Sequence, residues 1–258
     1  MRIALCLLSI SAAFAQVNRT ISVRGNEIMV TFQRTSGAMK RITGSPYSAD
    51  LIDQHTQTLA DGTIITDPPG SQHNARDSQG RSRVEVPLVV PKTGVNGFEP
   101  FMTQISDPVA GFLYLLDDQS KTAHRVKLNE TAAQDNRRKF NVPENHVSKG
   151  SDQQEIRVEN LGEKTIEGVL AKGVRTTITW PAGTRNNDRP IATTQETWFS
   201  EELQEVVYQK FTNPRNGEVV QRFDKVNRAE PDPMLFQPPA DYKIVDKEGT
   251  FVVTLHRP

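Results

Sequence analysis

Short runs of alternating apolar and polar residues, separated at close intervals by turn-forming residues, most constrain the fold of this chain. In the run 174–180, Val174, Ile178 and Trp180 share one face with Thr176, and the intervening positions are polar. Successive side chains of a β-strand point to opposite faces, so this two-residue period predicts strands. None of these windows keeps the 3.6-residue apolar stripe of a helix. The sequence therefore predicts a mainly β protein.

Turn signals between the runs predict antiparallel hairpins. Asp61-Gly62 separates a strand around 48–59 from one that begins near Thr63, and an Asp-Gly pair is a strong hairpin signal. Sequential hairpins make a meander, whereas the β/α alternation of nucleotide-binding folds is absent. Further turns are predicted at 78–80, at 117–120 and at 213–217, and the prolines at 67–70 interrupt a strand.

The segment 111–116, of sequence G-F-L-Y-L-L, is apolar on both of its faces. A strand in a half-exposed sheet is apolar on one face only, so another sheet, a helix or a ligand must cover the second face. Two short helical elements are predicted. One is a turn at 201–203 capped by Ser200, and the other spans 232–236 with Asp232 as its cap. Met234, Leu235 and Phe236 of the second are expected to plug one end of a sheet.

The first fifteen residues have the pattern of an export signal. Arg2 precedes a mostly apolar run at 3–14, and Ala13-Phe14-Ala15 has the small-x-small form that signal peptidase accepts. We therefore expect residues 1–15 to be a signal peptide that is cleaved between Ala15 and Gln16. A helix of 12 residues rises about 18 Å, which is too short for a membrane core of about 30 Å. The expected location is periplasmic or secreted, with no transmembrane segment after cleavage.

Residues 16–258 are expected to form a single, mostly antiparallel β domain. The only cysteine, Cys6, lies in the predicted signal, so disulfides and thiolate metal sites are excluded from this domain. The polar stretch near 129–152 is predicted to be a mobile connection, and 87–100 a second loop.

The charge balance excludes two classes of partner. The chain has 31 Lys plus Arg and 31 Asp plus Glu, so its formal charge is zero. A nucleic-acid-binding protein needs a basic excess, and so does a polybasic membrane-surface protein. Neither nucleic acid nor a charged membrane surface is therefore expected as a partner.

The sequence carries no established catalytic or metal-binding motif. Neither G-x-S-x-G nor H-E-x-x-H occurs, and the five histidines lack the spacing of zinc ligands, so no metal or cofactor is expected. In a strand, Asp53 and His55 share a face and could form a base with its orienting acid, but cross-strand polar pairing is the favoured explanation. An unrecognised hydrolase is thus the least favoured function.

Aromatic and apolar residues are the better candidates for a functional site. Placed on neighbouring antiparallel strands, the aromatics of the C-terminal half could form one apolar face, which is either a sheet core or a surface for an apolar ligand. The candidate ligand-binding residues are Phe112, Tyr114, Leu116, Trp180, Trp198, Phe211 and Phe223.

Four segments of the C-terminal half resemble a known group. They are L-G-E-K-T-I-E-G-V at 161–169, the run 174–180, E-T-W-F-S at 196–200 and D-P-M-L-F-Q-P-P-A-D-Y at 232–242. With R-D-S-Q-G-R-S-R at 76–83 and the run 105–117, they resemble uncharacterised exported bacterial proteins similar to LolA-like and RseB-like periplasmic domains. The resemblance implies an incompletely closed antiparallel β-barrel, with a few short helices over its apolar concave face. It supplies no catalytic residue.

Together these features predict an exported, non-catalytic module that binds a lipid-like or other apolar ligand. The alternative is an envelope structural or protein-interaction scaffold that contacts a protein partner through the loops at 87–100 and 129–152.

Overall fold

The computed structural model describes residues 17–24, 27–34, 41–87, 101–128, 137 and 139–256. The chain forms two compact units. Unit 1 comprises Met1–Ala49, Gln72–Arg137 and Asn227–Pro258, and unit 2 comprises Asp50–Ser71 and Arg138–Val226. One boundary, between residues 137 and 138, falls inside the polar connection predicted at 129–152. That the chain is a single domain stays a prediction, and the predicted cleavage site at Ala15 and Gln16 lies outside the described residues.

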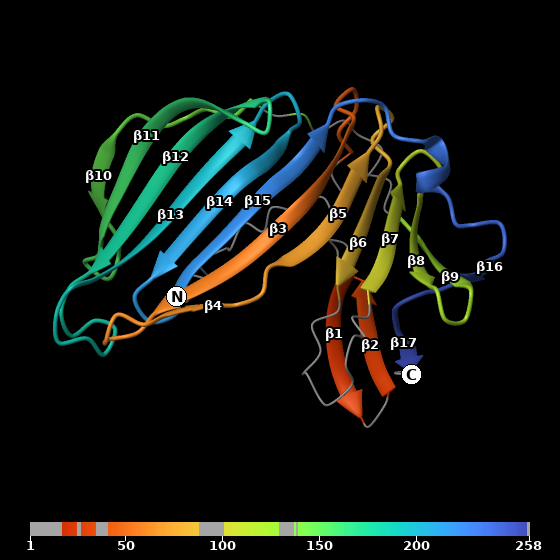
Figure 1. Cartoon of the computed structure of the whole chain (residues 1–258), viewed down its shortest axis with the longest axis horizontal. Coiled ribbons are helices and arrows are strands. Elements are labelled where there is room, and N and C mark those ends of the chain that lie inside the picture. The colour runs from red at the N-terminus through yellow and green to blue at the C-terminus, as the bar shows by residue number, and fades with distance from the viewer. Residues whose placement is uncertain are drawn as a thin grey trace. The chain divides into compact units, whose positions relative to one another are not determined.

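Unit 2 is built on one sheet, in the order β10-β11-β12-β13-β14-β15-β3, with β4 paired to β3 (Figure 1). Every pairing resolved between neighbours from β10 to β15 is antiparallel, as is the pairing of β3 with β4. The strands are β3 (Tyr47–Thr58), β4 (Ile64–Thr66), β10 (His146–Lys149), β11 (Glu155–Ile166), β12 (Val169–Trp180), β13 (Ile191–Ser200), β14 (Glu205–Asn213) and β15 (Gly217–Asn227).

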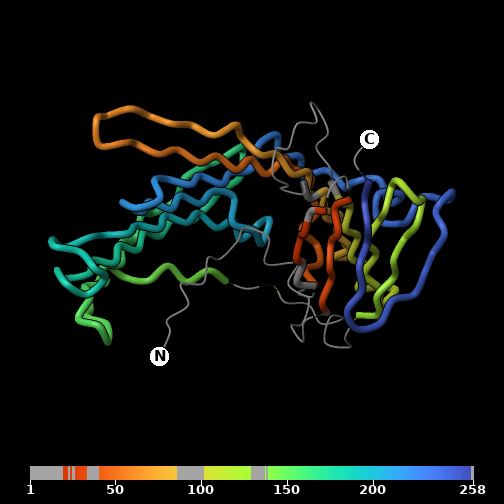
Figure 2. The backbone as a smooth tube through the Cα atoms, turned by 90° about the horizontal axis from the view of Figure 1, so that it is seen from below, coloured from red at the N-terminus to blue at the C-terminus, as the bar shows by residue number. Residues whose placement is uncertain are grey.

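The hairpins of unit 2 lie where the turn residues predict them. Asp61 Oδ1 accepts a hydrogen bond from the backbone of Thr63 (2.9 Å), and Gly62 has a φ of 86°. This turn joins β3 to β4, and Figure 2 shows the hairpin as a long orange loop of chain. Asn213 Oδ1 accepts from the backbone of Arg215 (2.9 Å) in the turn that joins β14 to β15. Ser200 is the last residue of β13, and its Oγ accepts a hydrogen bond from the backbone N–H of Leu203 (3.2 Å), which confirms the predicted capped turn.

The larger sheet of unit 1 has the order β5-β6-β7-β8-β9-β16. Its strands are β5 (Gly70–Arg76), β6 (Ser82–Pro87), β7 (Phe101–Asp107), β8 (Phe112–Asp117), β9 (Thr122–Lys127) and β16 (Lys243–Asp246). The first five form an antiparallel meander, whereas β16 pairs with β9 in parallel. An aspartate stabilises each of three turns: Asp77, Asp107 and Asp117 each accept two backbone N–H groups through Oδ1.

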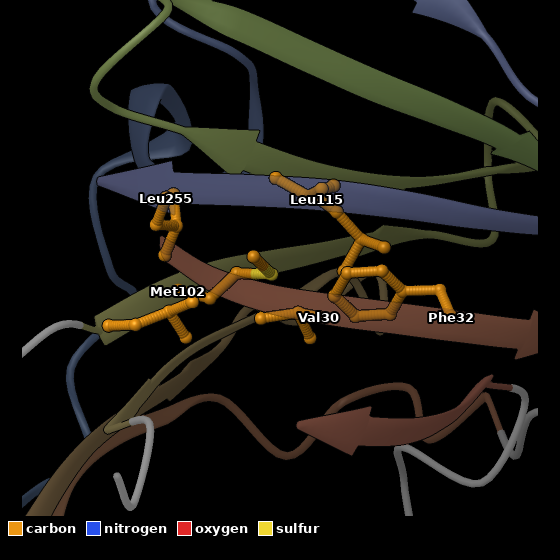
Figure 3. Packing of buried hydrophobic residues seen from close by; sticks show 7 residues of the cluster. Val30, Phe32, Met102, Leu115 and Leu255 are labelled. Atoms are coloured by element: carbon orange, nitrogen blue, oxygen red, sulfur yellow. The ribbon is translucent and has the colours of Figure 1, made fainter. Parts of the chain in front are cut away.

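A second, three-stranded sheet in unit 1 has the order β1-β2-β17 and is antiparallel. It comprises β1 (Val17–Arg24), β2 (Glu27–Arg34) and β17 (Thr250–His256). Its apolar residues form a cluster with Met102 of β7 and Leu115 of β8, in which Leu115 lies beside Phe32 of β2 (Figure 3). One face of the larger sheet is therefore covered by another sheet.

The doubly apolar strand is covered on its other face by a short helix. Tyr114 and Leu116 of β8 belong to a second buried cluster with Phe236, which lies in the 3₁₀ helix η3 (Pro233–Phe236). Asp232 caps η3 by accepting a hydrogen bond from the backbone of Met234 (2.9 Å), as the sequence predicts. Phe236 is fully buried, but Met234 is 68% exposed, so the prediction that Met234 helps to plug the sheet is wrong.

The structure confirms the predicted fold class. The chain is nearly all β, the strand pairings whose register is described above are antiparallel apart from that of β16 with β9, and the hydrogen-bonded strand order of the described residues does not close on itself. Within the described residues, no helix is long and apolar enough to cross a membrane.

Candidate functional site

The two faces of the unit 2 sheet differ in charge. Residues directly opposite each other in an antiparallel ladder share a face, so the register assigns every side chain to one side. Arg175, Glu196 and Lys210 lie opposite one another on β12, β13 and β14. One residue further along, the corresponding row is Thr176, Gln195 and Phe211. Charged side chains in these rows therefore point to one face of the sheet, and the residues next to them along each strand point to the other.

The charged face carries a network of ion pairs. Arg175 Nη2 contacts Glu196 Oε2 at 2.9 Å, and Lys210 Nζ contacts Glu218 Oε2 at 2.6 Å. Partial burial opposes the ionisation of Glu196, but hydrogen bonds from Trp198 and Arg175 hold its pKa below the usual value. This face comprises Glu155, Arg157, Glu159, Gly173, Arg175, Thr177, Thr179, Ala192, Thr194, Glu196, Trp198, Tyr208, Lys210, Thr212, Glu218, Val220 and Arg222.

The opposite side, which we call the uncharged face, contains no Asp, Glu, Lys or Arg. It comprises Ile156, Val158, Asn160, Val174, Thr176, Ile178, Trp180, Ile191, Thr193, Gln195, Thr197, Gln209, Phe211, Val219 and Gln221. Charged groups border it. Lys172, which binds Glu201 at 3.1 Å, lies beyond Val174, and Asp53 of β3 accepts a hydrogen bond from Gln221 (2.6 Å).

The uncharged face changes in character along the strands. At one end lie Trp180, Ile178, Ile191 and Ile156, which are apolar and half-buried. At the other end, Thr197, Gln209 and Gln221 form a row of neutral hydrogen-bonding groups. Val174 of β12 belongs to this polar row, since it pairs with Thr197. Trp180 lies six residues further along β12, which is about 20 Å. The face is thus a strip with an apolar end and a neutral polar end.

The predicted aromatic residues of unit 2 do not all lie on this strip. Trp180 and Phe211 do, and Phe223 follows Gln221 on the same side of β15, where it is fully buried. Trp198 lies on the charged face, directly opposite Gly173. Its indole covers Gly173, because a Cβ there would lie 2.8 Å from the ring, and Nε1 donates to Glu196 Oε1 at 2.7 Å.

The predicted residues Phe112, Tyr114 and Leu116 lie in unit 1, in the cluster with Phe236. Tyr114 and Leu116 are 8% and 3% exposed, and Phe112 is half-buried. These side chains pack against the chain itself. That any of the seven predicted residues contacts a ligand stays a prediction.

Gln209 was not singled out from the sequence. The residue is 5% exposed, and its Oε1 has no hydrogen-bond partner among the residues that the structure describes. The indole Nε1 of Trp180 is also buried without a partner. Buried polar groups are almost always hydrogen-bonded, so such atoms call for an explanation. The sequence indicates this site only weakly. It has one glutamine on each of three successive strands, Gln195, Gln209 and Gln221, but only the register of the strands shows that the three share a face.

His55 is held by two acceptors. Its Nδ1 lies 2.7 Å from Asp67 Oδ2, and its Nε2 lies 2.6 Å from the backbone oxygen of Asn216. The hydrogen bond to Asn216 and that to Asp67 raise the pKa of His55. When the ring is protonated, both nitrogens can donate to these acceptors, and His55 then links β3 to the β14–β15 turn. The acid that contacts His55 is Asp67 and not Asp53, so the structure agrees with the favoured interpretation, polar pairing with a neighbouring segment, and not with a base oriented by Asp53.

Across the described ranges, no group of three or more His, Cys, Asp or Glu side chains is placed to hold a metal ion.

No family model and no curated protein matches the sequence. Among solved structures, LprF from Mycobacterium bovis aligns with 73% of this chain and 90% of its own, at 11% identity and a TM-score of 0.29. A putative outer membrane lipoprotein-sorting protein domain from Vibrio parahaemolyticus aligns with 72% and 87%, at 10% identity and a TM-score of 0.16. At these TM-scores the likeness says nothing about what the chain binds.

Proposed function

We propose that this protein is an exported, non-catalytic module that binds a lipid-like or other apolar ligand on the uncharged face of unit 2. The observation that supports the proposal is the separation of charge across one sheet. In the rows that contain residues 174–180 of β12, every Asp, Glu, Lys and Arg lies on one side, and the other side combines apolar and neutral side chains; the next row on that other side begins with Lys172. A sheet face selected only for contact with water has no reason to exclude charge.

The size of the strip fits an extended hydrocarbon chain. Its length of about 20 Å exceeds the roughly 15 Å that one leaflet of a bilayer core of about 30 Å provides. Each 100 Å² of apolar surface that a ligand removes from water contributes about 2.5 kcal/mol. Trp180, Ile178 and Phe211 offer such surface, because all three are half-buried.

The state of His55 supports a non-catalytic role. A general base needs a nitrogen that can accept a proton, and both ring nitrogens of His55 are occupied by acceptors. The alternative role as an envelope scaffold would use the loops at 87–100 and 129–152, most of which lie outside the described residues, so it stays a prediction.

Two adjacent threonines provide the test. Thr176 lies in the middle of the uncharged face, and Thr177 lies on the charged face opposite Thr194. The protein and its T176K and T177K variants would be purified from the native host, extracted with organic solvent and compared by lipid mass spectrometry. We expect the unchanged protein and T177K to carry the same ligand and T176K to lose it, because a buried ammonium without a partner is costly. Equal loading of the two variants, or no ligand in any sample, would contradict the proposal.

A further inference from the structure

The uncharged face is apolar near Trp180 and polar near Gln209, and this difference between its two ends indicates what kind of ligand it would bind. Resting on the proposed function, we propose that the ligand is an amphiphile whose polar end is electrically neutral and donates a hydrogen bond to Gln209, while its hydrocarbon chain runs toward Trp180. Acylglycerols with a free hydroxyl group are ligands of this class.

The first argument is that the row of Gln209 contains no Lys or Arg. An anionic head group held against a protein is stabilised by Lys or Arg, commonly through bidentate hydrogen bonds from Arg. The row around Gln209 offers Thr197, Gln221 and Val174 instead. The nearest carboxylate along this row, that of Asp53, already accepts a hydrogen bond from Gln221 and would repel an anion. Two positive residues border the face. Lys172, in the next row, is paired with Glu201, and the guanidinium of Arg185 lies over the ring of Trp180 at the opposite end, 5.3 Å from its centre.

The second argument is the state of Gln209 itself. Its Oε1 is a buried acceptor without a donor among the described residues, in a residue that is 95% covered. A carbonyl oxygen can only accept, so the group that completes it must donate a proton, as a hydroxyl or an amide does. A deprotonated phosphate or carboxylate has no proton to donate and would place negative charge against this oxygen. Gln209 thus selects for a neutral donor.

The third argument is the opposite end of the strip. Trp180 lies six residues beyond the level of Gln209, next to Ile178, Ile191 and Ile156, and the guanidinium of Arg185 lies over its ring. The side chains of the sheet are apolar at this end. A head group at Gln209 therefore leaves about 20 Å of face for its hydrocarbon chain.

The test compares two lipids with identical acyl chains, dioleoylglycerol and dioleoyl phosphatidic acid, presented to the delipidated full chain in detergent micelles of matched composition. We expect the neutral lipid to bind at least about tenfold more tightly in native mass spectrometry, since the anion loses its hydration without a counter-charge. Equal affinity, or a preference for the anion, would overturn this inference and leave the proposed function standing. Binding of neither lipid would overturn both.

A second comparison isolates the hydrogen bond. Changing Gln209→Leu keeps the size of the side chain and removes the acceptor, and acetylating the hydroxyl of dioleoylglycerol removes the donor. We expect Q209L to weaken the binding of dioleoylglycerol about fivefold, the value of one net hydrogen bond, and to leave the binding of the acetylated lipid unchanged. An equal loss for both lipids would mean that Gln209 only supports the fold and would overturn its assignment to the head group.

Discussion

The two leucines in succession on β8 test whether the chain itself covers both faces of this strand. Leu115 is 1% exposed and packs with Phe32 and Met102, whereas Leu116 is 3% exposed and packs with Phe236. Changing either leucine to alanine removes three carbons from a filled site, at a typical cost of about 3 kcal/mol. We therefore expect Leu115→Ala and Leu116→Ala to lower the free energy of unfolding of unit 1 by similar amounts.

The assay must report on unit 1, because both tryptophans, Trp180 and Trp198, lie in unit 2. Hydrogen exchange of the β8 amides, followed by mass spectrometry across a urea series, provides this local measurement. Val252→Ala on β17, where the side chain is 49% exposed, serves as the control and should cost less than about 1 kcal/mol. If Leu116→Ala behaved like this control, η3 would not cover β8 and the description of the unit 1 core would be refuted.

Other perturbations have equally definite outcomes. His55 has a raised pKa, so the stability it gives unit 2 is present below pH 6.5 and is lost as the pH rises through its folded pKa; H55Q should abolish this dependence in urea unfolding followed by tryptophan fluorescence. For His124 the stability changes with pH in the opposite direction, because burial and Lys247 lower its pKa. The free energy of unfolding of unit 1 should fall as the pH drops below 6.5, and β8 amide exchange in H124F should lack that trend. Gly173→Ala places a Cβ 2.8 Å from the Trp198 ring and should cost about 1–2 kcal/mol, with a shifted emission maximum for Trp198; an unchanged spectrum would contradict the packing.

Local chemistry made part of the fold predictable. The Asp61-Gly62 hairpin and the cap of η3 by Asp232 depend on residues within a few positions of one another, and both lie where the sequence predicts them. The two apolar faces of β8 also required two covers, which the structure supplies as a sheet and a short helix.

Pairings between distant segments were not predictable in this way. The parallel pairing of β16 with β9 and the pairing of β17 with β2 join strands more than a hundred residues apart, and no local pattern encodes them. The face of Trp198 depends on the register of β13 against β12, which places it opposite Gly173. For the same reason the aromatic side chains alone gave an incomplete candidate site, and Gln209 appeared only once the strands were aligned.

The two tryptophans allow one direct measurement of the central claim, because Trp180 lies on the uncharged face and Trp198 on the charged face. The W198F variant reports only on Trp180, and W180F reports only on Trp198. Each variant would be titrated with dioleoylglycerol brominated on its acyl chains, with the unbrominated lipid as the control. We predict that the brominated lipid quenches the fluorescence of Trp180 in W198F and leaves that of Trp198 in W180F unchanged. Quenching of Trp198 alone, or equal quenching of both, would contradict the assignment of the ligand to the uncharged face.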